Sequence, residues 1–319
     1  MKRKLIPILL SAALLAAPGF YSQGQEVCKV EPDQTLRLYP EGQNIDKGLE
    51  GALGPLESNG FTREETVDQW GSLTYIGDNA RVDLYFPENP NGQMVVVCPG
   101  GGYWHVSSFN EGTYVAEWML ERGVSVAVVK YRLPNGHWEI PLRDVQNVFR
   151  YCRANAADWG MDQIGVMGFS AGGHLAASAT NLYTDSTTRP DFSILIYPVI
   201  TMDKALTHNG TRTCLIGEEG TAGLEYRYSI ENQVTENTPT SFLVHCTDDR
   251  TVPVENSIMY YESLLKHKVP VEMHIYPSGG HGWGFSSEKY KGKGKDNFSY
   301  ARPEFEASLE RWLEGIRTK

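Results

Sequence analysis

The chain has 319 residues, 41% of them hydrophobic and 21% charged, which is typical of a globular protein that can bury a sizeable core. Its formal net charge of −10 argues against nucleic acid as a partner, because phosphate binding needs clusters of lysine and arginine. The acidic balance does not identify a substrate, since most acidic proteins are simply soluble.

Residues 1–24 have the pattern of a secretory signal peptide. Three basic residues are followed by an apolar stretch over 5–17, and the small and polar residues before Gln25 offer a cleavage site, with a second candidate after Gly19. The apolar stretch is too short to span a bilayer comfortably, and no later segment comes close, so we expect no stable membrane insertion. The sequence therefore predicts an exported protein, either periplasmic or extracellular.

Residues 25–65 are polar and rich in glycine, and we expect them to form an irregular lead-in to one large domain over 66–319. The five cysteines include no CxxC pair, and their odd number leaves at least one thiol unpaired within the chain. We therefore do not expect a disulfide framework, although one bridge would be compatible with an oxidising compartment.

Strand-like and helix-like segments alternate along the rest of the chain. The strand-like segments are apolar or alternate polar and apolar residues, and they cover 81–86, 94–98, 124–129, 164–167, 192–197, 242–245 and 271–276. The helical patterns cover 113–122, 141–155, 254–266 and 303–316. Such alternation predicts an α/β fold, with a mostly parallel central sheet and helices on both faces. The less regular stretch over 201–234 is expected to be a small insertion or cap, and the charge-rich stretch over 287–297 a solvated loop.

A G-x-S-x-G motif is centred on Ser170, which follows a buried strand and precedes a helix start. This strand–turn–helix setting is what a nucleophile elbow requires, whereas the motif without its context recurs by chance. A glycine-rich turn with an N-capping serine is the alternative interpretation. We predict that Ser170 is a nucleophile, which needs an adjacent base oriented by a third group.

The base and its partner are sought downstream, because the chain order in this type of site is serine, acid, histidine. His281 lies on a glycine-flanked loop directly after a strand, whereas His208, His245, His267 and His274 lie in the insertion, in strands or on a charged helix face. We therefore predict that His281 is the base. For the acid, Asp248 and Asp249 follow the strand that ends at His245, and on the residues alone the choice between them stays open.

A glycine run over 100–102 follows the strand at 94–98. Ester hydrolysis builds negative charge on the carbonyl oxygen, and backbone N–H groups aimed at that oxygen stabilise it. Gly101, Gly102 and Ala171, the residue after the serine, are predicted to form this oxyanion hole. A phosphate-binding loop is excluded because no G-K-[ST] sequence follows the glycines.

Together these motifs resemble the α/β-hydrolase superfamily over about residues 70–316, and within it the acetylxylan-esterase-like and hormone-sensitive-lipase-like carboxylesterases of bacteria. The resemblance favours Asp249 over Asp248 as the acid, because it stands four residues after the strand-end histidine and shortly before Val-Pro. It also implies that Arg132 and Asp144 form a buried structural pair. One departure is Pro99, where many members have histidine before the glycines.

The resemblance and the predicted export imply a secreted serine esterase that deacetylates plant polysaccharide or oligosaccharide. Tyr103, Trp104 and Trp283 fall in loops near the predicted site, and their aromatic faces suit sugar rings, although packing at the rim of a pocket would explain them equally well. The expected partner is a small-molecule or oligosaccharide ester substrate. No metal or organic cofactor is expected, because the chain shows no HExxH motif and no zinc-type spacing of His and Cys. The sequence does not predict the oligomeric state.

Other functions are compatible with parts of the pattern. A feruloyl esterase or a general short-chain carboxylesterase would use the same residues. A peptidase of the prolyl-oligopeptidase type would carry a large N-terminal propeller, for which this chain has no room. A non-catalytic carbohydrate-binding protein on the same scaffold would be expected to have lost a triad residue, whereas all three candidates are present.

Overall fold

The computed structural model describes residues 30–39, 50–51, 54–55, 65–68, 71–74, 76, 79–285 and 296–317. The expected signal peptide over 1–24 lies outside the described residues, as does most of the charged loop expected over 287–297. Of the five cysteines, Cys28 is also outside them, and the four others are buried and form no disulfide.

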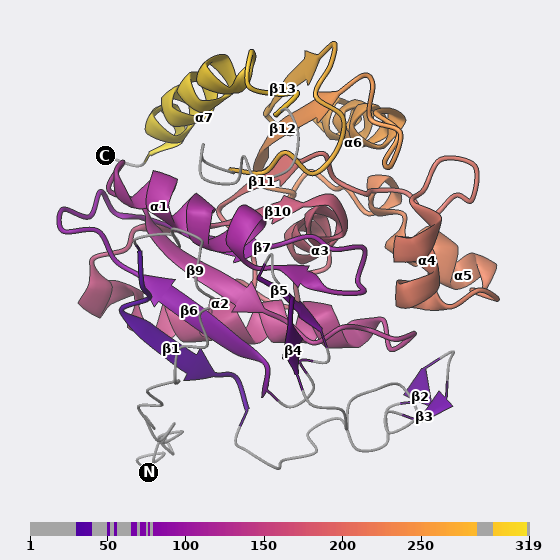
Figure 1. Cartoon of the computed structure of the whole chain (residues 1–319), viewed down its shortest axis with the longest axis horizontal. Helices are drawn as coiled ribbons and strands as arrows, with labels where there is room; N and C mark the ends of the chain where they lie inside the picture. Colours follow the sequence, from indigo (N-terminus) through magenta and orange to yellow (C-terminus); the bar gives the residue numbers. More distant parts are fainter. Residues whose placement is uncertain are drawn as a thin grey trace.

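An eight-stranded sheet forms the centre of the molecule (Figure 1). In spatial order its strands are β1 (Gln34–Arg37), β6 (Arg81–Tyr85), β9 (Ser125–Lys130), β7 (Gln93–Cys98), β10 (Gln163–Phe169), β11 (Phe192–Ile196), β12 (Thr240–Cys246) and β13 (Val271–Tyr276). The six strands from β9 to β13 are mutually parallel, and only β6 runs antiparallel to its neighbours β1 and β9. This confirms the predicted mostly parallel sheet.

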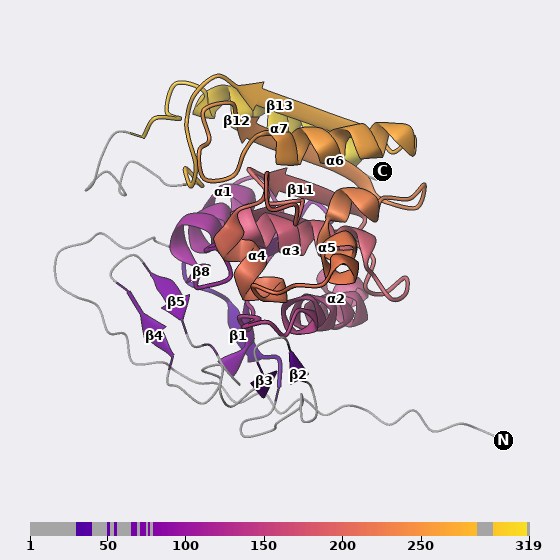
Figure 2. The same ribbon diagram turned by 90° about the vertical axis from the view of Figure 1, so that its right-hand side faces the viewer.

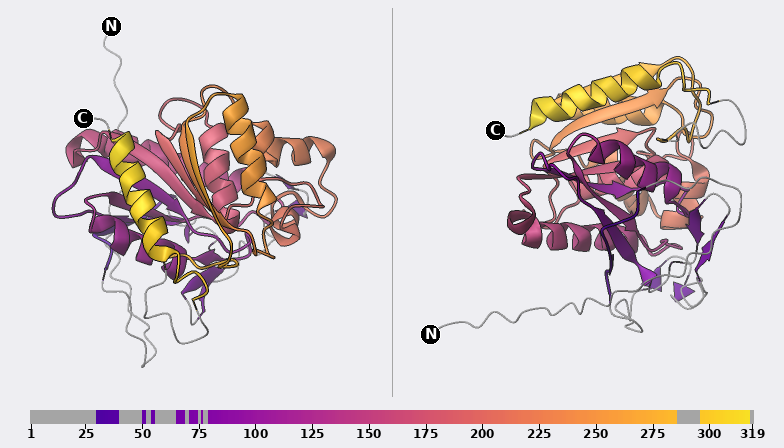
Figure 3. Two further views of the ribbon diagram at one scale, coloured as in Figure 1. Left: turned by 90° about the horizontal axis from the view of Figure 1, so that it is seen from above. Right: turned by 60° about the vertical axis from the view of Figure 1, so that its left-hand side comes forward.

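Helices cover both faces of this sheet (Figure 3). One face packs against α1 (Tyr114–Leu120) and α7 (Arg302–Ile316), and the other against α2 (Glu139–Trp159), α3 (Ser170–Asn181) and α6 (Glu255–Lys266). Alternate residues of β7 face the two layers, since Val95 and Val97 contact the first while Met94 and Val96 contact the second. Burial on both faces explains why this strand is continuously apolar.

The helix boundaries follow local chemistry. Pro141 lies in the first turn of α2, where a missing N–H costs nothing, and Gly160 ends the helix in a left-handed conformation with φ of 67°. The helix expected over 113–122 is shorter at both ends. A π-helical turn, η3 (Phe109–Thr113), precedes α1, which ends at Leu120. Among the described residues, no helix is long and apolar enough to cross a membrane.

The lead-in expected to be irregular over 25–65 contains a regular strand of the main sheet, β1, which pairs with β6. Tyr39, just after β1, donates its hydroxyl proton to Asp144 at 2.6 Å, and Arg132 forms an ion pair with the same carboxylate at 2.6 Å. The buried Arg132–Asp144 pair implied by the resemblance is thus present, and the lead-in takes part in it. Short strands complete the described part: β2 (Glu50–Gly51), β3 (Gly54–Pro55), β4 (Thr66–Val67), β5 (Ser72–Thr74) and β8 (Val106–Ser107).

The insertion between β11 and β12 forms a small helical cap, as expected from the sequence. It contains α4 (Asn209–Ile216), α5 (Ala222–Tyr228) and the 3-10 turn η4 (Ile230–Asn232), and Figure 2 shows α4 and α5 in front of α3. A hydrogen bond from His174 Nε2 on α3 to the carbonyl of Tyr228 at 2.8 Å attaches the cap to the sheet layer below it.

Candidate active site

Ser170 stands at the sharp turn between β10 and α3, with a positive φ of 53°. A non-glycine residue in this region costs about 1–3 kcal/mol, so the surrounding packing must hold it there. The two motif glycines allow that packing: a Cβ at Gly168 would stand 2.1 Å from the carbonyl oxygen of Gly172, and one at Gly172 2.2 Å from that of Cys98. The motif therefore forms an elbow that presents the serine hydroxyl.

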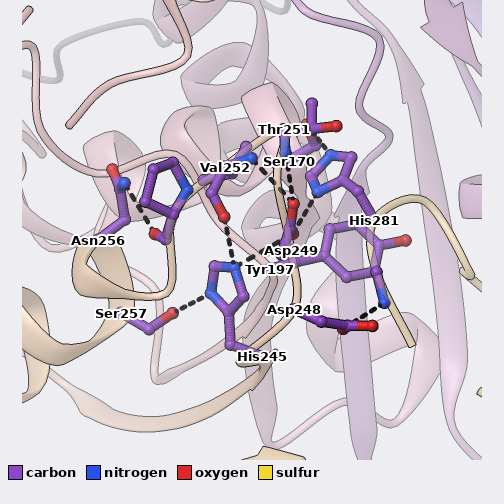
Figure 4. A network of polar contacts seen from close by, with 12 residues as sticks. Ser170, Tyr197, His245, Asp248, Asp249, Thr251, Val252, Asn256, Ser257 and His281 are labelled. Atoms are coloured by element: carbon purple, nitrogen blue, oxygen red, sulfur yellow. Dashed lines mark hydrogen bonds and ion pairs between the residues drawn. The ribbon is translucent and has the colours of Figure 1, made fainter. Parts of the chain in front are cut away.

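The structure brings Ser170, His281 and Asp249 into one chain of hydrogen bonds (Figure 4). His281 Nε2 lies 2.8 Å from Ser170 Oγ, and its Nδ1 lies 2.6 Å from Asp249 Oδ2. Because a carboxylate accepts, Nδ1 carries the ring proton and leaves Nε2 free to accept from the serine hydroxyl. This is the arrangement in which a histidine removes a proton from a nucleophilic serine.

Of the two candidate acids, Asp249 faces the histidine and Asp248 does not. Asp249 Oδ1 accepts from the N–H groups of Thr251 and Val252, at 2.9 Å each, which fixes the carboxylate. Asp248 is exposed and accepts a hydrogen bond from the N–H of Gly280 at 2.8 Å. Burial raises the pKa of Asp249, but hydrogen bonds from two histidines outweigh burial and hold the pKa well below its usual value.

The second of these histidines is His245, at the end of β12. It is fully buried, and its Nε2 lies 3.0 Å from the carbonyl oxygen of Val252 and 3.2 Å from Asp249 Oδ2 (Figure 4). Both oxygens accept, so Nε2 carries a proton, and Nδ1 lies 2.8 Å from Ser257 Oγ. His245 thus holds the loop and the carboxylate that orient His281.

The glycine loop lies directly beside the nucleophile, since a Cβ at Gly100 would stand 3.0 Å from the Cβ of Ser170. Gly101, Gly102 and Tyr103 have φ values of 128°, 63° and 60°, a left-handed run that glycine adopts readily and tyrosine rarely does. No described residue accepts a hydrogen bond from the N–H of Gly101 or Gly102. Ala171 is the second residue of α3, in the first turn, where a backbone N–H has no partner within the helix. All three predicted donors are therefore available to a ligand.

A buried acid that the sequence did not single out holds this loop. Glu111, in η3, accepts from the N–H of Gly100 at 2.7 Å and from the hydroxyl of Tyr197 at 2.8 Å. Tyr197 in turn accepts from the N–H of Gly284 at 2.9 Å, and its ring centre lies 4.7 Å from that of His281. Burial raises the pKa of Glu111, while the hydrogen bonds and the nearby histidine limit the rise. The sequence offered only one signal, an acidic residue just before the helical pattern over 113–122.

The three aromatic residues predicted to bind substrate lie in different environments, and their role in substrate binding stays a prediction. Tyr103 is 2% exposed, with its hydroxyl 3.1 Å from His174 Nδ1. Trp283 is 5% exposed and stacks on Phe298 with ring centres 3.8 Å apart. Both rings are buried by packing. Trp104 is 64% exposed and stays a candidate.

The model of the BD-FAE family matches residues 82–264, which include the glycine loop, Ser170 and Asp249. The chain belongs to the BD-FAE family. The part outside the match contains β13 and His281.

Curated relatives of this BD-FAE family chain include an acetylxylan esterase of Xylanibacter ruminicola. It is 40% identical over 214 residues, which are 65% of this chain and 44% of that protein. Endo-1,4-beta-xylanase B of Butyrivibrio fibrisolvens is 33% identical over 212 residues, which are 61% of this chain and 33% of that protein. The matches thus span less than half the length of these two relatives.

Solved structures similar to the BD-FAE family chain are α/β-hydrolases, which confirms the predicted fold class. An acetyl ester-xyloside bifunctional hydrolase from Caldicellulosiruptor lactoaceticus matches with a TM-score of 0.70 and 29% identity, covering 90% of this chain and 98% of that one. A sugar hydrolase from Lactococcus lactis matches with a TM-score of 0.64 and 29% identity, covering 79% and 97%.

Proposed function

We propose that the protein is an exported serine esterase that removes acyl groups, chiefly acetyl, from plant polysaccharide or oligosaccharide. The observation that carries this proposal is the continuous hydrogen-bond chain from Ser170 through His281 to Asp249. Its hydrogen-bonding geometry is already suited to proton transfer.

The reaction has two halves. In the first, Ser170 Oγ attacks the ester carbonyl carbon and passes its proton to His281 Nε2; the bond to the alcohol oxygen then breaks, and that oxygen takes the proton from His281. In the second, water attacks the acyl-serine and gives a proton to His281, which returns it to Ser170 as the acid departs. Asp249 stabilises the histidine cation formed in each half.

Negative charge develops on the carbonyl oxygen in both halves. We assign the N–H groups of Gly101, Gly102 and Ala171 to that charge, because the two glycines follow Gly100, which borders Ser170, and Ala171 follows the serine. In serine hydrolases, removing one such donor costs about 3–4 kcal/mol in the barrier. Since the glycine loop is held by Glu111, the donors need little rearrangement when the charge appears.

The proteins to which the chain is similar support the substrate assignment. An acetylxylan esterase and a xylanase are among its curated relatives, and an acetyl ester-xyloside hydrolase is among the similar solved structures. The basic and apolar N-terminal pattern supports export, which would bring the enzyme into contact with extracellular or periplasmic polysaccharide.

Labelling and acetate release test the proposal together. We expect a fluorophosphonate probe to modify the folded protein at Ser170 and not to modify Ser170→Ala. We also expect the wild type to release acetate from acetylated xylan, and Ser170→Ala to release none. An unreactive Ser170 in folded protein would instead support a carbohydrate-binding module. Cleavage of aryl esters or feruloyl esters without acetate release would remove the support for polysaccharide deacetylation.

A further inference from the structure

His208 is a cap residue that reaches the catalytic loop. It precedes α4, more than a hundred residues along the chain from the glycine run. A Cβ placed on Gly102 would meet His208 Cε1 and Trp104 Cδ1, each at 3.5 Å. The imidazole and the indole therefore both border Gly102, one of the predicted oxyanion donors.

The hydrogen bonds of His208 determine which of its ring nitrogens can donate. Its Nδ1 accepts from the backbone N–H of Thr211 at 3.2 Å and lies 2.8 Å from the hydroxyl of the same residue. A backbone N–H can only donate, so Nδ1 carries no proton and the neutral ring carries its proton on Nε2. Nε2 is bonded to Cε1, the ring carbon that approaches Gly102.

The neutral form of this ring is the favoured one. Burial lowers the pKa of His208, and the neighbouring His281 lowers it further, against a smaller opposing effect of Asp249. These interactions also place His208 within electrostatic reach of two residues of the triad. The ring is half-buried, and no described residue accepts a hydrogen bond from its Nε2. Among the described residues, this N–H donor therefore has no acceptor, and it belongs to a ring that borders Gly102.

Trp104 adds an apolar face next to this donor. Its side chain is 64% exposed, and its backbone N–H donates to the carbonyl of Gly101 at 2.9 Å, which fixes it to the same loop. An aromatic face with one polar donor beside it matches a sugar ring, which presents C–H groups on its face and hydroxyl groups at its edge. An aryl alcohol offers the face but has no hydroxyl groups beside the ester.

We propose that His208 and Trp104 form a subsite for the alcohol part of the ester, and that this alcohol is a hydroxyl-bearing sugar. His208 Nε2–H donates to a sugar hydroxyl near the acetylated position, and Trp104 packs against the ring face. The proposal rests on the proposed esterase function, and it assigns to the cap a part in choosing the substrate.

The test is a specificity ratio: kcat/KM for an acetylated xylo-oligosaccharide divided by kcat/KM for para-nitrophenyl acetate, which has the same acyl group. The informative variant is His208→Asn, because asparagine can still accept from the N–H of Thr211 at the start of α4 but removes the ring donor. Loss of one hydrogen bond predicts a ratio about tenfold lower in His208→Asn. Trp104→Ala should lower the ratio as well, whereas His267→Asn, which changes a histidine at the end of α6, should leave it as in the wild type.

A binding measurement separates this proposal from the esterase proposal. In the Ser170→Ala background, calorimetric titration with the acetylated xylo-oligosaccharide should give a Kd that rises several-fold when His208→Asn is added. If the wild type cleaves neither ester, the esterase function fails, and the titration still tests the subsite. An unchanged ratio, including an equal loss on both esters, or an unchanged Kd would overturn the subsite.

Discussion

Replacing Asp249 by asparagine tests the triad most directly, because each oxygen of its carboxylate faces two defined N–H groups. Oδ1 accepts from two backbone N–H groups, and Oδ2 accepts from His281 Nδ1 and lies close to His245 Nε2. An amide keeps only one acceptor atom. If that atom stays with the two backbone groups, the amide NH2 faces His281, and Nδ1 must then accept. The ring proton moves to Nε2, which can no longer take the proton of Ser170.

The magnitude follows from that change of tautomer. The equivalent replacement in a serine protease lowers kcat about ten-thousandfold, which corresponds to about 5.5 kcal/mol in the barrier. We expect a loss of this size for Asp249→Asn in the hydrolysis of para-nitrophenyl acetate. The matched control is Asp248→Asn, whose amide oxygen can still accept the exposed hydrogen bond from the N–H of Gly280, and it should lower kcat by no more than about fivefold.

Initial rates at neutral pH, with near-UV circular dichroism to confirm folding, measure both variants. If folded Asp249→Asn kept more than a tenth of the wild-type kcat, the assignment of the triad acid would be refuted. A larger loss in Asp248→Asn than in Asp249→Asn would point to the neighbouring carboxylate instead.

Three further outcomes are expected. Tyr39→Phe removes a hydroxyl that donates to buried Asp144, so the free energy of unfolding in urea should fall by about 1–3 kcal/mol, and a fall below about 0.5 kcal/mol would contradict the anchoring of β1. Burial lowers the pKa of His174 to about 4, below its value of about 6.5 in the unfolded chain, so its contribution to stability is complete above about pH 6.5 and is lost as the pH falls toward 4. Between about pH 7 and pH 5 the loss should be about 2 kcal/mol by chemical denaturation, and His174→Gln should show a flatter pH dependence. Glu111→Gln leaves either Gly100 or Tyr197 without its acceptor, so steady-state kinetics should show kcat reduced about tenfold or more with a smaller change in KM, and an unaltered kcat would argue against its role.

Most of the fold was predictable because the sheet is buried on both faces. Continuous apolar runs marked the central strands, and the helices between them showed the expected period. Strand β1 was missed, since it is a four-residue edge strand that is half exposed and has no apolar alternation strong enough to mark it. Its place in the sheet depends on pairing with β6, more than forty residues away, which no local pattern shows.

The site was predictable where chemistry leaves a motif and not where it depends on packing. Ser170 and His281 stand in turns rich in glycine, so their sequence context pointed to them. No local pattern shows the partners of Glu111, because one is a backbone N–H of Gly100 and the other is the hydroxyl of Tyr197, 86 residues along the chain. Nearness to a motif did not distinguish a buried aromatic ring such as Trp283 from an exposed one such as Trp104, since both stand within four residues of a catalytic segment.

The contact between Glu111 and Tyr197 has a consequence for how the enzyme can vary. Through these two side chains, the peptide before the oxyanion donors and the loop after His281 are fastened to each other. These hydrogen bonds, none of which involves a cap residue, therefore help to set the spacing between the base and the predicted oxyanion donors. Sequence changes in the cap can alter which alcohol is accepted while that spacing is preserved, so new substrate preferences can evolve without repeated repair of the catalytic geometry.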